Sequence, residues 1–444
     1  MPFVRIALPV PLYRYFDYIL PASMKVVVGA RVLVPFGAQK RVGVVVDVVE
    51  QTDVPKEQLK PVLGCLDDTS LFSPESWQFL SWAANYYHAP LGEVLLQALP
   101  VKLRQGESAL EKQKIFWKST ALGEQALAQG LLKRSKKQLE ALQAAKDGME
   151  KGNNPFGSGI WSALKAKEYI TEIAQEPEIQ TWQQQLAGEP IVNKADRLTL
   201  NKQQALVFSQ LKFTQGFVAW LLDGVTGSGK TEIYLQFIEE ILNQGKQVLV
   251  LVPEIGLTPQ TVSRFQARFN VVIDVLHSNL NDTQRLHVWQ RARSGQSAVI
   301  IGTRSALFTQ FADLGAIIID EEHDASFKQQ DGWRYHARDL AVVYAKQLNI
   351  PVLMGSATPC LESLNNVQQG KYQRLCLSEK ANQSTALQQH VIDLKHQSMH
   401  NGLSEILIKR MQAHLEKGNQ VLLFLNRRGF APVLLCHECG WMAE

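Results

Sequence analysis

The sequence predicts a multidomain chain in which a doubly wound α/β domain with a parallel sheet follows a small β-rich domain and a basic helical domain. Three observations lead to this fold class. The length of 444 residues is more than one core holds. Short β-branched runs separated by Pro and Gly fill residues 1–105. From residue 198 onward, apolar strand-like runs alternate with helical patterns.

Composition and charge narrow the function classes. The apolar share of 45% is ordinary for a globular protein, and neither an export signal nor a run of 18 apolar residues occurs. Five cysteines, mostly isolated, suit a reducing compartment, so we expect a cytoplasmic location. A net charge of +4 permits a polyanion partner without requiring one. Any nucleic-acid argument must therefore rest on local clusters.

Residues 1–105 predict a small barrel or sandwich, because prolines and glycines interrupt short strand-like runs. Residues 77–87 have apolar positions at helical spacing and predict a helix that packs on this sheet. We expect the aromatic side chains of that helix to belong to the core.

Residues 106–176 predict a helical, basic domain. Ser135 and Gln138 fit a capping box that opens a helix over 136–145. The cations around that helix start are Lys133, Arg134, Lys136 and Lys137. They oppose the helix dipole, so a phosphate-facing role and a solvated charge run both remain open. A helical pattern resumes over 160–173, and residues 177–197 predict a linker or a mixed connection.

From residue 198 the pattern is that of a parallel sheet with helical crossovers. The predicted strands are 218–222, 247–252, 272–276, 298–301, 316–319, 352–354, 391–394 and 421–425. In such sheets the chemistry lies at the carboxyl ends of the strands. The motifs that follow are found there.

A glycine-rich turn follows the strand at 218–222 and precedes a helix over 232–243. Its pattern, G-x-x-x-x-G-K-T, is that of a phosphate loop. The predicted nucleotide-binding residues are Gly224, Val225, Thr226, Gly227, Ser228, Gly229, Lys230 and Thr231. Backbone N–H groups of this turn point at phosphate oxygens, Lys230 reaches the β and γ phosphates, and Thr231 offers a hydroxyl to Mg²⁺.

The strand at 316–319 runs directly into Asp320, Glu321, Glu322 and His323. Burying several acids at a strand end is costly without a cation, and a magnesium nucleotide supplies one. We therefore predict that Asp320 holds the metal through a water molecule and that Glu321 orients and deprotonates the attacking water. His323 is predicted to relay to the γ-phosphate or to a moving lobe.

Three further strands end in hydroxyl-rich turns: VPEIGLTPQ at 252–260, IGTRSALF at 301–308 with Arg304, and GSATP at 355–359. Each could hold phosphates of a nucleic-acid strand. Their order around a phosphate loop and an acidic tetrad is informative where each alone is weak.

With these motifs the chain resembles the superfamily 2 helicases and, in detail, the PriA family of primosomal helicases. The match is carried by GVTGSGKT, VPEIGLTPQ, DEEH, GSATP and FLNRRG at 424–429, together with FDY at 16–18 and VPFG at 34–37. The resemblance implies an ATP-driven 3′-to-5′ DNA helicase that recognises stalled forks and D-loops and initiates primosome assembly for replication restart. Implied cofactors are ATP and Mg²⁺, with Zn²⁺ in the full-length family member.

The resemblance also implies the domain order and the partners. It assigns 1–105 to a 3′-DNA-end-binding domain, 106–176 to a winged helix, 198–378 to a RecA-like lobe and 379–444 to part of a second lobe. Implied partners are forked and single-stranded DNA, single-stranded-DNA-binding protein, PriB, DnaT, and the replicative helicase with its loader. It implies no membrane partner and a nucleoid-associated location.

Several residue roles follow only from the resemblance. Gln204, in LNKQQ, matches the position that contacts adenine. Residues 326–339, here called the aromatic segment, resemble the loop that couples single-stranded DNA to hydrolysis. Its implied stacking and phosphate-binding residues are Phe327, Lys328, Trp333, Arg334, Tyr335, His336 and Arg338. The implied pocket for a 3′ end is Phe16, Asp17, Gly37 and Lys60.

The chain departs from the family pattern near its end. Cys436 and Cys439 form one C-x-x-C pair, which is half of a four-cysteine zinc site, so we expect weak zinc binding. Arg427 and Arg428 are the remaining second-lobe candidates for a DNA or nucleotide contact. We expect a truncated product. Its function is then a DNA-dependent ATPase, a fork-binding module without unwinding activity, or a translocase on RNA or chromatin.

Overall fold

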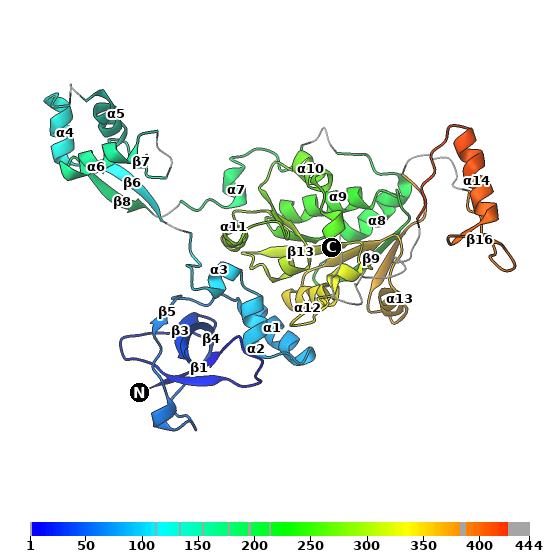
Figure 1. Ribbon diagram of the computed structural model, residues 1–444, viewed down its shortest axis with the longest axis horizontal. Coiled ribbons are helices and arrows are strands. Elements are labelled where there is room, and N and C mark those ends of the chain that lie inside the picture. The colour runs from blue at the N-terminus through cyan, green and yellow to red at the C-terminus, as the bar shows by residue number, and fades with distance from the viewer. Residues whose placement is uncertain are drawn as a thin grey trace, which may run out of the picture. The chain divides into compact units, whose positions relative to one another are not determined.

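The computed structural model describes residues 2–111, 113–132, 135–152, 155–175, 178–193, 197–212, 215–381 and 388–424. The chain divides into two compact units, Met1–Asn382 and Gln383–Glu444. The first unit contains an N-terminal β domain, an α+β module and an α/β domain (Figure 1).

The N-terminal domain is built on a five-stranded antiparallel sheet in the order β2-β1-β4-β3-β5. Its strands are β1 (Phe3–Ala7), β2 (Phe16–Ile19), β3 (Arg31–Phe36), β4 (Gln39–Val49) and β5 (Gly64–Cys65). The backbone of Ile19 also bonds to Lys60 and Val62, which lead into β5, so the sheet curls into a small barrel. The barrel expected from the sequence is therefore present.

Three helices follow the barrel: α1 (Pro74–Tyr86), α2 (Leu91–Gln97) and α3 (Val101–Arg104). Helix α1 begins where Ser73 Oγ accepts the N–H of Ser76 at 3.1 Å and Pro74 occupies the first turn. Phe79 is buried, as predicted for the core of this helix. The rings of Trp82 and Tyr86 instead stack on each other at the surface, so that prediction is wrong for these two.

The second module has β6 (Lys114–Ser119), α4 (Ala121–Ala128), α5 (Lys136–Ala144), β7 (Met149–Glu150), α6 (Ser158–Ala166) and β8 (Ile170–Gln175). The strands form a sheet in the order β7-β6-β8, and the rings of Trp117 and Trp161 stack in its core. Helix α5 begins as predicted, but the Ser135 side chain makes no capping bond, because its backbone (φ −124°, ψ 72°) is not that of a capping residue. The helix predicted over 160–173 ends at Ala166.

The predicted linker over 177–197 contains a packed turn of helix, α7 (Trp182–Gln185). A capping box between Thr181 and Gln184 opens it. The ring of Trp182 is 2% exposed and belongs to the core of the α/β domain. Of the two predicted alternatives, this part of the segment fits a mixed connection and not a linker.

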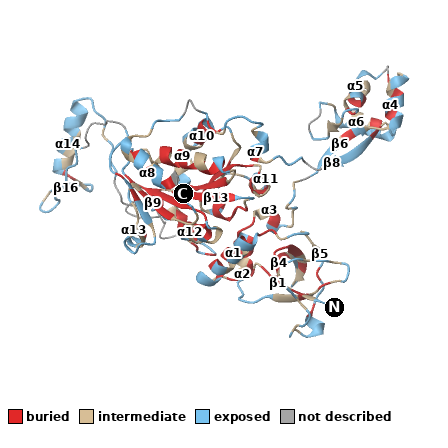
Figure 2. Ribbon diagram, turned by 180° about the vertical axis from the view of Figure 1, so that it is seen from behind, coloured by how far each residue is buried: buried red, intermediate tan, exposed pale blue. Residues whose placement is uncertain are grey.

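The α/β domain is organised on a seven-stranded parallel sheet in the order β11-β12-β10-β13-β14-β9-β15. The strands are β9 (Ala219–Gly224), β10 (Gln247–Leu251), β11 (Ile273–Leu276), β12 (Val299–Gly302), β13 (Leu314–Asp320), β14 (Val352–Ser356) and β15 (Gln373–Leu377). The central strands are buried along almost their whole length, as expected for a parallel sheet covered on both faces (Figure 2).

Helices cover both faces of this sheet. One core contains side chains of α7, α8 (Lys202–Lys212), α9 (Lys230–Asn243) and α10 (Pro259–Arg268). The other contains side chains of α11 (Asp282–Arg293), α12 (Ala337–Leu348) and α13 (Leu361–Gln368). The second core continues into α1, α2 and α3 of the N-terminal domain.

The strand predictions hold for six of the eight runs. Residues 391–394 and 421–424 form no strand, and β15 was missed. In β15 only Leu375 and Leu377 are buried, so its signal is the weak alternation of an edge strand. Within residues 388–424, the second unit contains β16 (Met399–His400), β17 (Leu403–Ser404) and α14 (Glu405–Glu416).

The N-terminal domain packs on α12 of the α/β domain. The rings of Phe79 and Tyr344 stack with centroids 4.6 Å apart, and the Tyr344 hydroxyl lies 2.9 Å from Ser76 Oγ. Arg293 donates to the carbonyl of Ser70 at 2.9 Å. Side chains of both domains belong to one hydrophobic core, so the interface between the domains is part of that core.

Candidate functional site

The phosphate loop connects β9 to α9. Gly229 precedes the helix at φ 82°, a conformation that favours glycine, and a Cβ there would lie 2.4 Å from Nε2 of Gln204. The N–H groups of Lys230 and Thr231 belong to the first turn of α9, where no intrahelical acceptor exists. Lys230 Nζ donates to the carbonyl of Gly224 at 2.9 Å. The turn therefore offers backbone donors, a helix N-terminus and a cation at one point.

One cavity of about 670 Å³ joins the phosphate loop to the acidic turn. Lys230 and Thr231 line it from α9, and Asp320 and Glu321 line it from the end of β13. The loop residues Thr226, Gly227, Ser228 and Gly229 also line it. The structure thus brings together the two motifs whose proximity the sequence predicted.

Asp320 ends β13, and its Oδ1 accepts hydrogen bonds from the Tyr234 hydroxyl at 3.0 Å and the Glu321 N–H at 3.1 Å. Burial, and then repulsion from Glu321, raise the pKa of Asp320, while Tyr234 and Lys230 oppose the shift. A buried carboxyl of this kind is where a divalent cation gains most from electrostatic attraction.

Tyr234 is a site residue that the sequence analysis missed. It lies on α9, one turn after the phosphate loop, and is 2% exposed. A Cβ on Gly355 would lie 1.6 Å from its hydroxyl oxygen, so the glycine of GSATP leaves the space through which Tyr234 reaches Asp320. A polar tyrosine one turn into the helix was the available signal.

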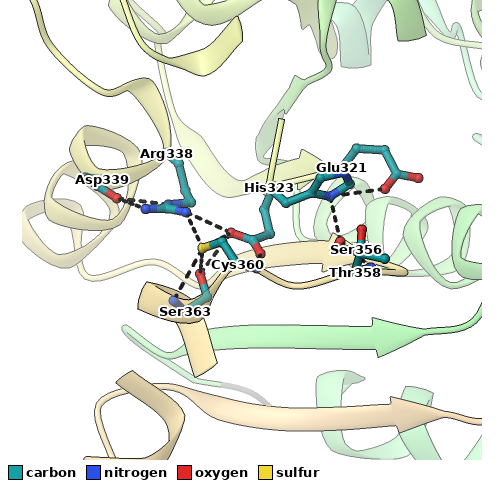
Figure 3. Close-up of polar contacts among 9 residues, drawn as sticks. Glu321, His323, Arg338, Asp339, Ser356, Thr358, Cys360 and Ser363 are labelled. Atoms are coloured by element: carbon teal, nitrogen blue, oxygen red, sulfur yellow. Dashed lines mark hydrogen bonds and ion pairs between the residues drawn. The ribbon is translucent and has the colours of Figure 1, made fainter. Parts of the chain in front are cut away.

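The side chains of the acidic turn diverge. Glu321 has φ 47°, a left-handed conformation that is uncommon outside glycine. Its carboxylate lies 3.7 Å from His323 Nδ1, which in turn lies 2.7 Å from Ser356 Oγ at the end of β14 (Figure 3). His323 therefore joins the acidic turn to the GSATP turn, and its relay role stays a prediction.

Glu322 is 0% exposed and does not belong to the lining of the cavity. Its carboxylate accepts from Arg338 Nη1 at 3.1 Å, from the Cys360 N–H at 2.8 Å and from Ser363 Oγ at 2.8 Å (Figure 3). Burial raises the pKa of the Cys360 thiol, which also donates to Glu322. The sequence analysis gave Glu322 no role.

The residues present fit a magnesium nucleotide. Lys230 and the loop amides supply donors for phosphates, and Thr231 and Asp320 supply the oxygen ligands that Mg²⁺ prefers. Ser228 Oγ is buried and, among the described residues, has no hydrogen-bond partner. Gln204 lies against the loop, because its Nε2 donates to the Ser228 carbonyl at 2.8 Å. Its contact with adenine stays a prediction.

A groove of about 460 Å³ lies at the ends of β10, β11 and β12. Its lining includes Thr303 and residues of the VPEIGLTPQ turn. The VPEIGLTPQ turn and Thr303 of the IGTRSALF turn thus line one groove, and phosphate binding there stays a prediction. Arg304 does not lie free in it, because its guanidinium donates to the carbonyl of Ser326 at 3.0 Å.

The aromatic segment does not expose its rings, so the expectation that they present free stacking faces is wrong. Phe327, Trp333 and Tyr335 are 1%, 2% and 5% exposed. Trp333 and Tyr335 pack on Phe308, and Tyr87 of the N-terminal domain contacts Trp333 edge-on. These aromatic rings are therefore buried against other side chains of the same protein.

The cations of the aromatic segment divide into two groups. Arg338 is buried against Glu322 and Asp339, so the expectation that it contacts a phosphate is wrong for this conformation. Arg334 is exposed, and Lys328 Nζ donates to the Arg334 carbonyl while lying 5.4 Å from the ring of Tyr87. DNA contact by Lys328 and Arg334 stays a prediction. His336 donates its backbone N–H to the Tyr87 hydroxyl at 3.1 Å.

The four residues predicted to bind a 3′ end line one pocket of about 290 Å³ in the N-terminal domain. They are Phe16, Asp17, Gly37 and Lys60. The Asp17 carboxylate accepts from Thr52 Oγ1 at 2.5 Å and lies 3.4 Å from Arg5 Nε. An aromatic ring, a carboxylate and a lysine in one small pocket suit a nucleotide with a free hydroxyl.

Six residues singled out in the sequence analysis lie outside the described residues: Lys133, Arg134, Arg427, Arg428, Cys436 and Cys439. Within the described ranges, no group of three or more His, Cys, Asp or Glu side chains is placed to hold a metal ion. The same ranges contain no helix with the length and apolar character that crossing a membrane requires.

Comparisons with known proteins agree with this geometry. Residues 5–100 match the family described as the 3′DNA-binding domain (3′BD) of PriA, and residues 201–367 match the DEAD/DEAH box helicase family. The chain is 68% identical to a replication restart protein PriA of Haemophilus influenzae over 100% of its own length and 61% of that relative. It is 30% identical to the Bacillus subtilis protein of the same name, over 97% of this chain and 62% of that relative.

Among solved structures, RecG bound to a three-way DNA junction matches with a TM-score of 0.33 and 23% identity, over 43% of this chain and 25% of that one. The chain spans about three fifths of the length of the curated relatives it matches, 61% and 62% for the two named above.

Proposed function

The chain belongs to the PriA family of replication restart proteins, and from this we propose that it is a DNA-dependent ATPase that moves 3′ to 5′ on DNA. Its proposed substrates are stalled forks and D-loops with a free 3′ end, and its proposed task is to initiate primosome assembly for replication restart. The observation that carries the proposal is the single cavity shared by Lys230, Thr231, Asp320 and Glu321.

The proposed chemistry is attack of water on the γ-phosphate of ATP, which forms a bond from the water oxygen to the γ-phosphorus, breaks the bond to the β,γ-bridging oxygen and releases ADP. Lys230 and the loop amides would hold the phosphates, and Thr231 and Asp320 would hold Mg²⁺, which would supply positive charge beside the phosphate oxygens. Glu321 orients the water and takes its proton. His323 transmits a conformational change of the acidic turn to Ser356, whose Oγ lies 2.7 Å from His323 Nδ1 at the end of the neighbouring strand. Gln204 contacts the adenine once it leaves the loop carbonyl.

The proposed DNA contacts lie in two domains. The 3′-terminal nucleotide stacks on Phe16 and donates its hydroxyl to Asp17, while Lys60 meets its phosphate. The groove at the ends of β10, β11 and β12 takes the backbone of a single strand. We assign the module over 114–175 as a winged helix, because it combines helices α4, α5 and α6 with a three-stranded sheet.

The proposed partners are single-stranded-DNA-binding protein, PriB, DnaT, and the replicative helicase with its loader, and the proposed location is the cytoplasm, at the nucleoid. We propose zinc for the longer family member only, with Cys436 and Cys439 as one half of its site. A second candidate function is a fork-binding module without unwinding activity. The burial of Trp333 and Tyr335 favours it, because these rings offer no stacking face in this conformation.

The test is phosphate release by the purified chain, with and without forked DNA that carries a free 3′ end. We expect forked DNA to stimulate turnover, and Lys230→Ala to abolish it. Lys346→Ala, which removes a lysine from the last turn of α12, is the matched control and should leave turnover unchanged. Absence of turnover with intact fork affinity would establish the binding module instead. Preference for RNA over DNA would contradict both candidates.

A further inference from the structure

A buried cluster ties the acidic turn to two helices on the side away from the nucleotide cavity. It consists of Glu322, Arg338, Cys360 and Ser363, and we call it the clasp (Figure 3). Arg338 lies in the first turn of α12, Cys360 is the N-cap of α13, and Ser363 lies in the first turn of α13. Arg338 Nη1 also donates to Cys360 Sγ at 2.6 Å. Three separate segments therefore meet at one carboxylate.

The clasp also closes the aromatic segment. The aromatic segment begins at Ser326, three residues after His323, and its last three residues form the start of α12. Glu322 therefore lies just before the segment, and Arg338 lies close to its end. Within the segment, the backbones of Lys328 and His336 form an isolated antiparallel β-bridge, and the Gln329 N–H donates to the Tyr335 carbonyl at 2.9 Å. The segment is therefore a closed loop, and one ion pair joins its end to the turn just before its start.

The neighbours of Glu322 connect this ion pair to the nucleotide cavity. Glu321 lines the cavity, and His323 bonds to Ser356. The left-handed backbone at Glu321 turns these consecutive side chains in different directions. Glu322 therefore lies between two residues that contact the cavity or its neighbouring strand end, and it is bonded to Arg338 in a close-packed interior.

Capping of α13 alone does not explain a buried glutamate. Cys360 is already the N-cap residue of α13, with Ser363 N–H bonded to its sulfur. Burying a carboxylate and a guanidinium costs more free energy than well-packed apolar side chains of similar volume. Burial lowers the pKa of Arg338, but its acidic neighbours, Asp339 first among them, raise it overall, so Arg338 stays charged. An ion pair that is buried at this cost in free energy suits a role in fixing the relative position of the segments that it joins.

We propose that Glu322 is a positioning residue that couples the nucleotide cavity to the aromatic segment through its bond to Arg338. The proposal rests on the proposed function, since it presumes that the cavity takes a magnesium nucleotide and the segment a single DNA strand. Glu322 touches neither ligand. Glu322 fixes the position of the C-terminal end of the aromatic segment relative to Glu321. A conformational change at one of the two sites therefore changes the conformation of the other.

The test is thermodynamic coupling, because coupling needs no hydrolysis. The affinity of the purified chain for a labelled oligothymidine is measured with and without a non-hydrolysable ATP analogue and Mg²⁺. In the native chain we expect the analogue to change DNA affinity by about fivefold or more. In Glu322→Gln and Arg338→Lys we expect that factor to fall to about one, with each ligand alone binding as in the native chain. The Arg338→Lys variant keeps the charge but loses the planar fork that reaches two partners at once.

The matched control is Asp274→Asn. Asp274 also pairs with an arginine, Arg291, in the same domain, but lies outside the clasp. The Asp274→Asn variant should lower the free energy of unfolding of the chain. It should leave unchanged the factor by which the ATP analogue changes DNA affinity. Ser363→Ala removes a single donor to Glu322 and should lower the factor partly, which covers the case in which Glu322→Gln fails to fold. Hydrogen exchange at the Gln329 amide provides a second readout, and the analogue should change its rate only while the clasp is intact.

The outcomes separate the two proposals. If the native chain binds neither the analogue nor DNA, the proposed function is wrong. If it binds both without coupling, or if the clasp variants keep the native factor, the function stands and the positioning role of Glu322 is refuted.

Discussion

Replacing Tyr234 with phenylalanine tests whether Asp320 acts as an oriented metal ligand. The change removes one of two hydrogen bonds to Asp320 Oδ1 and leaves the bond from the Glu321 N–H. A hydrogen bond to a charged group contributes about 1.5–3 kcal/mol. A group that orients a metal ligand typically matters about 10- to 100-fold in metal affinity. We therefore expect Tyr234→Phe to weaken magnesium-dependent nucleotide binding by about tenfold, since about 1.4 kcal/mol is tenfold.

The assay is titration of a fluorescent ATP analogue, once with Mg²⁺ and once with EDTA. Only the magnesium-dependent affinity should fall, because Tyr234 donates to Asp320, the residue proposed to hold the metal. Tyr344→Phe is the control, since Tyr344 is also buried but its hydroxyl meets Ser76 and not a carboxylate. Equal magnesium-dependent affinities in the two variants would refute the orienting role of Tyr234.

Three further predictions concern the loop, the 3′-end pocket and the contact between domains. Gly229→Ala should weaken nucleotide binding about tenfold or more, because it strains a left-handed position and pushes Gln204 away; a fluorescent-nucleotide titration measures this, and unchanged affinity would contradict it. Asp17→Asn should abolish discrimination between DNA with a free and with a phosphorylated 3′ end, measured by anisotropy, whereas retained discrimination would exclude Asp17 as the acceptor. Tyr87→Ala should speed hydrogen exchange at the His336 amide, while unchanged exchange would show that Tyr87 does not hold the aromatic segment around Trp333.

The nucleotide cavity could be predicted from the sequence because the rule behind it is local. Parallel strands bring their carboxyl ends to one edge of the sheet, so a phosphate loop after β9 and an acidic turn after β13 must approach each other. Lys230 and Asp320 follow from that rule alone. Tyr234 does not, because its reach to Asp320 depends on the absence of a side chain at Gly355, which is distant in sequence.

Arg338 and Glu322 show where local patterns fail. An arginine beside aromatic residues indicated a phosphate contact, yet its partner is a buried glutamate just before the start of the same segment. Ion pairing across a closed loop leaves no periodic signal. Ser135 fails for a related reason, because a capping pattern specifies residue types but not the backbone angles that the preceding chain imposes.

The burial of the aromatic segment changes what DNA binding there must achieve. Stacking a base on an exposed aromatic ring contributes about 1–3 kcal/mol. Trp333 and Tyr335 already contact Phe308, and Tyr87 completes the packing around Trp333. A base that stacks on these rings must replace those contacts, so the net gain is smaller than on a free surface. Tyr87 belongs to the domain with the 3′-end pocket, and therefore any movement of that domain on DNA alters the free energy needed to release the rings.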